Sequence, residues 1–284
     1  MRSGGRLILL LAVCLLAPLL APLLVACESA PVTGRSQLML VSESEERQMG
    51  ERAYNQLLAR EVEVRDGGWA VSTVDRVGRR IADAAEAPPA RMWKAPNYDW
   101  EFRTINKPVV NAFCLPGGKI AVYTGLLQVV QSDAELAAVM GHEVAHALAR
   151  HSAERLSDQR AATIGLTALT IGLAVLGARS GATSAGTSAA ISVAAMAAGA
   201  GVNYGILMPM SRKQESEADH IGLVLMAMAG YDPHAAIDFW ERLRSLNPGK
   251  KGPEWMSTHP TDEARIADLK NWLPEAMKYY RPRD

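Results

Sequence analysis

The pattern of apolar and polar positions predicts a chain built mostly of helices. A first helix is expected to begin in the acidic stretch Ser42–Glu46 and to run to about Arg60, because acidic side chains favour a helix N-terminus. A second helix is expected over Val71–Ala87, since Pro88 and Pro89 follow it and cannot continue it. These helices precede a region with a different pattern.

That region predicts a small sheet. Apolar and polar residues alternate over Tyr98–Ile105, which is typical of a strand, and Lys119–Thr124 is expected to be a second short strand. Between them, Asn111–Gly118 is expected to be a loop or an edge strand, and Gly125–Val130 a short helix. Together with the helices, these strands indicate an α+β fold that is mostly helical, with a small mixed sheet.

Three more helices are expected towards the C-terminus. The first covers Gln214–Ala229 and ends at Gly230, a residue suited to the left-handed conformation after a helix. The others cover Pro233–Leu246, capped by Asp232, and Thr261–Trp272. No repeat of about 34 residues appears, so a tetratricopeptide array is not expected.

A long segment of residues 161–211 has a different composition, with Arg179 as its one charged residue and many Ala, Gly, Ser and Thr residues. A helical hairpin or lid is one interpretation, and one or two weak transmembrane helices are another. The hairpin is favoured, because Thr and Gly make Ala161–Ala178 a poor membrane span. The low-complexity part, Ser180–Ser192, is also compatible with disorder.

The N-terminus reads as a targeting segment. Basic Arg2 and Arg6 precede the uncharged apolar run Leu7–Leu24, for which a retained membrane anchor is the alternative. Leu24-Val25-Ala26-Cys27 resembles the bacterial lipobox, which implies cleavage before Cys27 and lipid attachment to its sulfur. Residues 1–26 are therefore expected to be a lipoprotein signal peptide and residues 27–41 a linker next to the lipid.

This targeting segment suggests a location and a redox state. The resemblance implies lipid anchoring on the periplasmic side of a cell envelope, and Glu28 after the cysteine favours the outer over the inner membrane. Cys14 would be removed and Cys27 lipidated, which leaves Cys114 as a free thiol without a disulfide partner. The formal net charge is zero and no basic stripe is present, so nucleic-acid binding is not expected.

The segment with the clearest chemistry is His142-Glu143-x-x-His146. Residues four apart share a helical face, so the two histidines can offer nitrogens to one metal ion. Glu143 lies about 100° round the helix and is free to act on a metal-bound water. Ser132 or Asp133 can cap this helix. The pattern is typical of a zinc hydrolase of the metalloprotease type.

A catalytic zinc needs a third protein ligand, and the predicted helix that begins near residue 214 can supply it. Glu215 and Asp219 share one face, so one can bind zinc while the other accepts a hydrogen bond from a ligating histidine. Glu217 points about 200° away from Glu215 and is expected to face solvent.

Several motifs together resemble the HtpX and Oma group of zinc metallopeptidases, of the gluzincin type, which includes the prenyl-protein CaaX endopeptidases. The chain is most similar there to bacterial periplasmic lipoprotein or BepA-like members, but without their tetratricopeptide domain. The motifs that carry the resemblance are Asn111-Ala-Phe, Pro116-Gly-Gly-Lys-Ile, Thr124-Gly-Leu-Leu, His142-Glu-Val-Ala-His146, Glu215-Ser-Glu-Ala-Asp219, and Ser257-Thr-His-Pro260 with Arg265.

The resemblance implies a zincin-like peptidase domain over residues 42–275, followed by a tail over residues 276–284. It implies one zinc per chain, bound by His142, His146 and Glu215. It also implies Glu143 as the catalytic base and Asp219 as support for a ligating histidine.

Two further residues are carried over from the resemblance. His259 matches a histidine that can cap the zinc and hold such enzymes latent, and Arg265 matches an arginine near the active site. The expected function is a metalloendopeptidase that cleaves misfolded or misassembled envelope proteins. The alternative is a non-enzymatic assembly factor or chaperone with a retained zinc site. The oligomeric state and the cleavage preference stay open.

Overall fold

The computed structural model describes residues 27–64, 67–89, 92–180, 210–245, 254–259 and 263–282. The expected signal peptide and the low-complexity part of the uncharged segment lie outside the described residues. The chain divides into two compact units. The first holds the described residues 27–29, 36–42 and 152–180, and the second holds all the other described residues.

The first unit contains a small hairpin and most of one long helix. Strands β1 (Cys27–Ser29) and β2 (Ser36–Leu38) pair antiparallel. The range expected to be a linker therefore contains ordered structure, and Gln37, Met39 and Val41 within it are buried. This corrects the linker expectation, because the local sequence does not show that these side chains are covered in the fold.

Helix α6 (His151–Ser180) leads into the uncharged segment of residues 161–211. This helix begins ten residues before the segment and runs through its first 20 residues. A hairpin or lid beyond Ser180 lies outside the described residues. Within the described part of the chain, no helix is both long and apolar enough to cross a bilayer.

The second unit contains a three-stranded mixed sheet in the order β3-β5-β4. β3 (Glu101–Ile105) runs parallel to the central strand β5 (Lys119–Tyr123), and β4 (Ala112–Leu115) runs antiparallel to β5 on its other side, so β3 and β4 are the two edge strands. The first strand begins later than expected, because the backbone N–H of Tyr98 donates to the Glu86 carboxylate instead of to a neighbouring strand.

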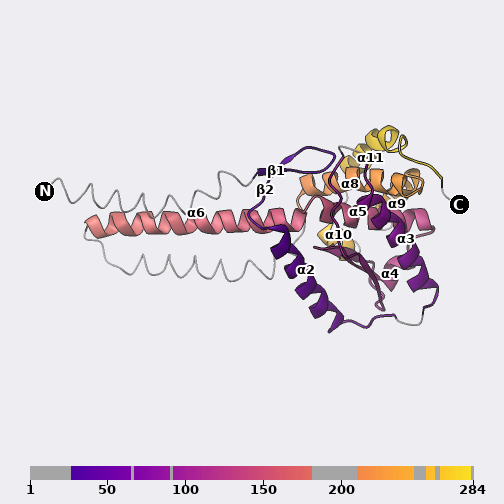
Figure 1. Cartoon of the computed structure of the whole chain (residues 1–284), viewed down its shortest axis with the longest axis horizontal. Helices are drawn as coiled ribbons and strands as arrows, with labels where there is room; N and C mark the ends of the chain where they lie inside the picture. The colour runs from indigo at the N-terminus through magenta and orange to yellow at the C-terminus, as the bar shows by residue number, and fades with distance from the viewer. Residues whose placement is uncertain are drawn as a thin grey trace. The chain divides into compact units, whose positions relative to one another are not determined.

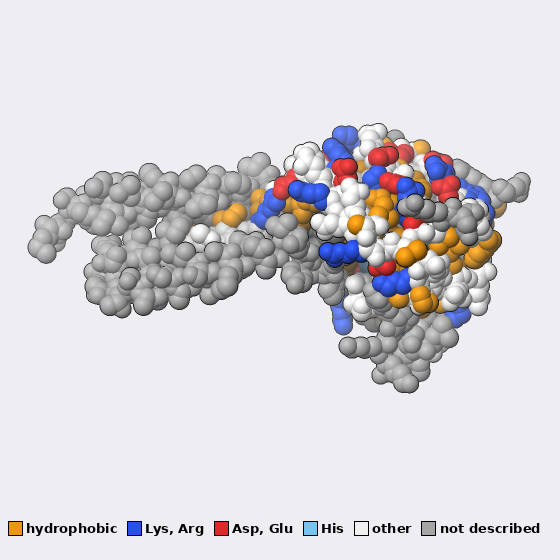
Figure 2. Space-filling model, turned by 90° about the horizontal axis from the view of Figure 1, so that it is seen from below, with side chains coloured by type: hydrophobic (Ala, Val, Ile, Leu, Met, Phe, Trp, Pro, Cys, Tyr) orange, Lys and Arg blue, Asp and Glu red, His pale blue; other side chains and the backbone are white. Residues whose placement is uncertain are grey.

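Helices make up the other regular elements described for this unit (Figure 1). They are α2 (Glu43–Leu58), α3 (Trp69–Glu86), α4 (Thr124–Leu127), α5 (Asp133–Leu148), α8 (Arg212–Met228), α9 (His234–Ser245), α10 (Glu254–Thr258) and α11 (Glu263–Ala276). Of these, α2, α3, α4 and α5 pack against the sheet. This architecture confirms the expected α+β class, mostly helical with a small mixed sheet. Figure 2 shows side chains of both charge signs interspersed over the face in view.

Two elements near the C-terminus differ from the expectation. The short helix α10 was not anticipated, and α11 continues through Pro274 to Ala276. Tyr279 and Tyr280 then pack against the core. The range expected to be a tail therefore belongs in part to the packed unit, because its aromatic side chains cover apolar surface.

The core of the second unit is the crossing of α5 and α8. Every residue of α5 from Glu135 to Leu148 is buried, and the Ser132 hydroxyl caps its start by accepting from the Glu135 N–H. The two helices approach closely where Gly141 faces Gly222, since a Cβ built on Gly222 would lie 2.9 Å from the backbone nitrogen of His142. Small residues at the crossing thus bring the backbones of both helices together.

Candidate metal centre

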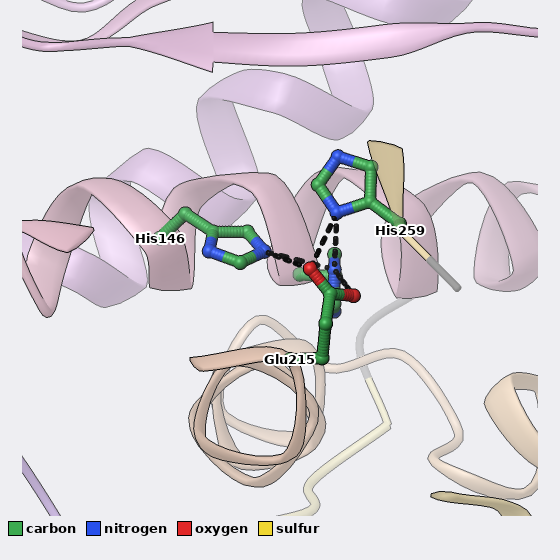
Figure 3. Close-up of side chains that lie close together, drawn as sticks. His146, Glu215 and His259 are labelled. Carbon is green, nitrogen blue, oxygen red and sulfur yellow. Dashed lines mark hydrogen bonds and ion pairs between the residues drawn. The ribbon is translucent and has the colours of Figure 1, made fainter. Parts of the chain in front are cut away.

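Four buried side chains from three parts of the chain converge beside this crossing. His142 and His146 come from α5, Glu215 from the first turn of α8, and His259 from the residue after α10. One ligand atom from each lies within 4.8 Å of the others. Figure 3 shows the Glu215 carboxylate pointing towards His146 and His259.

The distances within this set suit a zinc ion. The Nε2 atoms of His142 and His146 are 3.0 Å apart, and the Glu215 carboxylate oxygens lie 3.4 Å and 3.5 Å from them. Tetrahedral zinc with bonds of about 2.0–2.1 Å places its ligand atoms about 3.3 Å apart. The residues present therefore fit a zinc ion, with nitrogen and oxygen donors of the types that it prefers.

The electrostatics of the set favour a positive charge between Glu215 and the histidines. Burial lowers the pKa of His142, but Asp219 and Glu215 outweigh it and raise that pKa to about 9. Burial likewise raises the pKa of Glu215, and hydrogen bonds from His142 and His259 outweigh it and lower that pKa. A bound cation satisfies both groups at once.

Asp219 and Arg265 stand behind two of these groups. The Nδ1–H of His142 donates to Asp219 Oδ1 at 2.9 Å, which leaves Nε2 facing the site. Arg265 donates to both Asp219 oxygens, at 2.7 Å and 2.8 Å, and its Nη1 lies 2.8 Å from Glu215 Oε2. Asp219 and Arg265 thus tie the carboxylate of one candidate ligand to the imidazole of another.

Glu143 lies at the same site but outside the four-residue set. Trp255 Nε1 donates to its Oε1 at 2.8 Å, and His259 Nε2 is 3.5 Å from the same oxygen. The Trp255 ring stacks on His259 with centroids 4.8 Å apart. Trp255 was missed from the sequence, because α10 is a single short turn without a period to detect.

The position of Glu217 corrects the expectation that its side chain faces solvent. Glu217 is buried at 4% exposure rather than facing solvent, and its carboxylate accepts from His151 Nε2 at 3.0 Å. Burial raises the pKa of Glu217, but hydrogen bonds from His151, Arg35 and Thr33 outweigh it and lower that pKa to about 2. The helical wheel was right about direction, and His151, Arg35 and Thr33 contact the Glu217 carboxylate on that face.

Cys114 lies on the edge strand β4 near this site. Burial, with a smaller contribution from the charge of Glu143, raises the pKa of its thiol well above the usual value. A thiol is a poor nucleophile without its thiolate, so this environment argues against a nucleophilic role for Cys114.

The fold and the donor set together define a zinc metallopeptidase. The chain belongs to peptidase family M48, whose family model matches residues 70–273. This confirms the resemblance found in the sequence, the zinc cofactor and the metalloendopeptidase class.

Several curated proteins are similar over most of the chain. Mitochondrial metalloendopeptidase OMA1 of Schizosaccharomyces pombe is 34% identical over 88% of this chain and 67% of its own length. The human metalloendopeptidase OMA1 is 30% identical over 88% of this chain and 47% of its own length. The beta-barrel assembly-enhancing protease of Escherichia coli is 28% identical over 87% of this chain and 47% of its own length. The chain thus spans about half the length of the last two relatives.

These relatives contradict the expected location. From the sequence, the protein was expected on the periplasmic side of a bacterial envelope, lipid-anchored and at the outer membrane. The OMA1 relatives from yeasts, plant and human are mitochondrial by name and include the higher identities. The lipobox is a four-residue pattern, which is too short to outweigh similarity over most of the chain.

Proposed function

We propose that this protein is a zinc endopeptidase of protein quality control, which cleaves misfolded or misassembled proteins. The observation that carries the proposal is the convergence of His142, His146 and Glu215 with Glu143 beside them but outside the ligand set. A purely structural zinc site needs no such acid. The assigned roles are ligands for the first three residues and catalytic base for Glu143.

Each residue then has a part in peptide-bond hydrolysis. Zinc, when bound, polarises the scissile carbonyl and lowers the pKa of a bound water from 15.7 to about 7. Glu143 accepts the proton of the attacking water and passes it to the leaving amine, while Trp255 fixes one oxygen of its carboxylate. Asp219 holds the ring of His142, and Arg265 acts through Asp219 and Glu215.

The sheet supplies a reason for preferring unfolded substrates. β4 is an edge strand, and the charge of Glu143 contributes to the raised pKa of its residue Cys114. An extended peptide can add to such an edge through main-chain hydrogen bonds. A folded protein cannot offer a free extended segment, so this geometry favours misfolded chains.

His259 gives the site a latent state in this proposal. Its Nδ1 lies 3.3 Å from His142 Nε2 and 2.9 Å from Glu215 Oε1, among the other donor atoms. A fourth protein ligand leaves no open position for water. Replacement of His259 by Ala is expected to raise peptidase activity. Lower activity of His259→Ala with unchanged zinc content would instead make His259 a catalytic group.

The same closed set supports the alternative of a non-enzymatic assembly factor or chaperone, for which zinc is a structural staple. Incubation with unfolded casein separates the two. An endopeptidase cleaves the casein, loses this activity to a chelator and regains it with zinc. An assembly factor suppresses aggregation of the casein and leaves it intact.

Lipid attachment to Cys27 concerns the thiol of that residue alone and stays a prediction apart from the bacterial location, which the relatives contradict. The side chain is exposed at the start of β1. Mass spectrometry of the N-terminal peptide from the native source tests it. An unmodified cysteine, or a chain that still carries residues before it, would refute the lipid.

A further inference from the structure

A chain of hydrogen bonds leads away from His146, on the side opposite to the metal-facing nitrogen. The Nδ1 atom of His146 lies 2.7 Å from Nδ1 of His151, and Nε2 of His151 lies 3.0 Å from Oε2 of Glu217. His146, His151 and Glu217 are all buried, with His151 at 0% exposure. We propose that His151 and Glu217 are positioning residues for the ligand His146.

The direction of these bonds follows from chemistry. An ionised carboxylate only accepts, so His151 Nε2 carries the hydrogen and donates to Glu217. In a neutral ring Nδ1 of His151 is then an acceptor, and His146 Nδ1–H donates to it. His146 is thereby held in the tautomer whose Nε2 lone pair points to the metal. Carboxylate partners do this for many ligating histidines, and here the imidazole of His151 lies between the ligand His146 and the carboxylate of Glu217.

The backbone between the two histidines makes the contact possible. In a continuous helix, residues five apart point in different directions. Here α5 ends and Arg150 adopts a left-handed conformation with φ of 54°, so the chain turns and α6 begins at His151. Arg150 Nε donates to the Glu46 carboxylate at 2.8 Å, which supports the turn.

The far end of the chain of hydrogen bonds lies near the N-terminus of the described protein. Arg35 Nε donates to Glu217 Oε2 at 2.8 Å, and the Thr33 hydroxyl donates to Oε1. Thr33 and Arg35 belong to the segment 30–35, which joins β1 to β2 and belongs to the same unit as the metal centre. This segment therefore completes the metal centre, although it precedes the expected peptidase domain.

The proposal rests on the assigned zinc ligands, so the test measures zinc binding as well as activity. Zinc affinity is measured by competition with a chromophoric chelator, and the cobalt-substituted protein gives an absorption spectrum of the ligand field. His151→Leu is expected to weaken zinc binding about 10–100-fold and to shift the cobalt bands. His151→Gln keeps an acceptor and a donor, and is expected to recover part of the loss.

Arg35→Met provides a milder variant, since this side chain is 26% exposed and its loss leaves the buried histidines in place. It is expected to weaken zinc binding in the same direction by a smaller factor. Arg76→Met is the matched control, because Arg76 pairs with Asp133 at the start of α5 without a link to a ligand. Its zinc affinity and cobalt spectrum are expected to match the unmodified protein.

The outcomes separate this proposal from the proposed function. An unmodified protein that binds no stoichiometric zinc refutes the proposed function itself. If the unmodified protein binds zinc while Arg35→Met stays within about twofold of Arg76→Met, the positioning role is overturned. His151→Gln as weak as a folded His151→Leu also overturns it, because packing rather than hydrogen bonding would then explain the loss. Should His151→Leu fail to fold, Arg35→Met decides.

Discussion

The close crossing of α5 and α8 makes Gly222 a sensitive position for the metal centre. A Cβ added there would lie 2.9 Å from the backbone nitrogen of His142 and 3.0 Å from the carbonyl carbon of Gly141. Ordinary carbon contacts are about 3.5–4.0 Å, so Gly222→Ala must push the helices apart by about 0.5–1 Å. The two helices carry opposite sides of the ligand set, and that set separates with them.

The magnitudes decide which property reveals the change. Overpacking costs about 1–3 kcal/mol, whereas Ala in place of Gly gains about 1 kcal/mol of helix propensity. The free energy of unfolding is therefore expected to fall by no more than about 2 kcal/mol. Metal sites tolerate only about 0.2 Å, and a misplacement of 1 Å can cost about 100-fold in rate. Activity and zinc affinity are thus expected to fall far more than stability.

The assay compares kcat/KM on a fluorogenic unfolded substrate, zinc affinity and urea unfolding. Gly165→Ala in α6 is the matched control, because an added Cβ there has no atom within 4 Å. It is expected to keep full activity and to gain up to about 1 kcal/mol. Gly222→Ala with kcat/KM within about threefold of the unmodified protein would refute the view that this crossing sets the ligand geometry.

Three other predictions concern single side chains. Asp219→Asn removes one of the two carboxylates that face buried Arg265, and because Glu215 still pairs with Arg265 it is expected to cost about 1.5–3 kcal/mol in urea unfolding of the metal-free protein; a cost below about 1 kcal/mol would contradict the coupling. Ser132→Ala removes the cap on the Glu135 N–H and is expected to cost about 1 kcal/mol in the free energy of unfolding by the same assay. An unchanged free energy of unfolding would mean that this cap does not stabilise α5. Cys114, whose pKa is raised by burial, is expected to react with iodoacetamide at pH 8 much more slowly in the folded than in the unfolded protein. Equal rates by peptide mass spectrometry would refute that environment.

The sequence could predict the ligand-bearing helices because their signals are local. The spacing of His142 and His146 and the caps at Ser132 and Gly230 all depend on neighbours within a few residues. The same holds for β4 as an edge strand, which the turn residues on either side favour.

The rest depends on contacts that local patterns do not contain. Glu217 was assigned to solvent from its helical direction, but its carboxylate accepts hydrogen bonds from Arg35 and His151. His151 reaches His146 only because Arg150 breaks the helix in a conformation that the sequence does not favour. Trp255 lies in a short helix whose packing, rather than its periodicity, fixes it on Glu143.

The central claim is that Glu143 is a catalytic base rather than a metal ligand. Replacement of Glu143 by Gln keeps the shape of the side chain and an oxygen acceptor for Trp255. The measurement is zinc content and cleavage of unfolded casein by Glu143→Gln beside the unmodified protein. One zinc per chain is expected in both proteins, with loss of cleavage in the variant. Retained zinc with undiminished cleavage would contradict the role of Glu143 as the base.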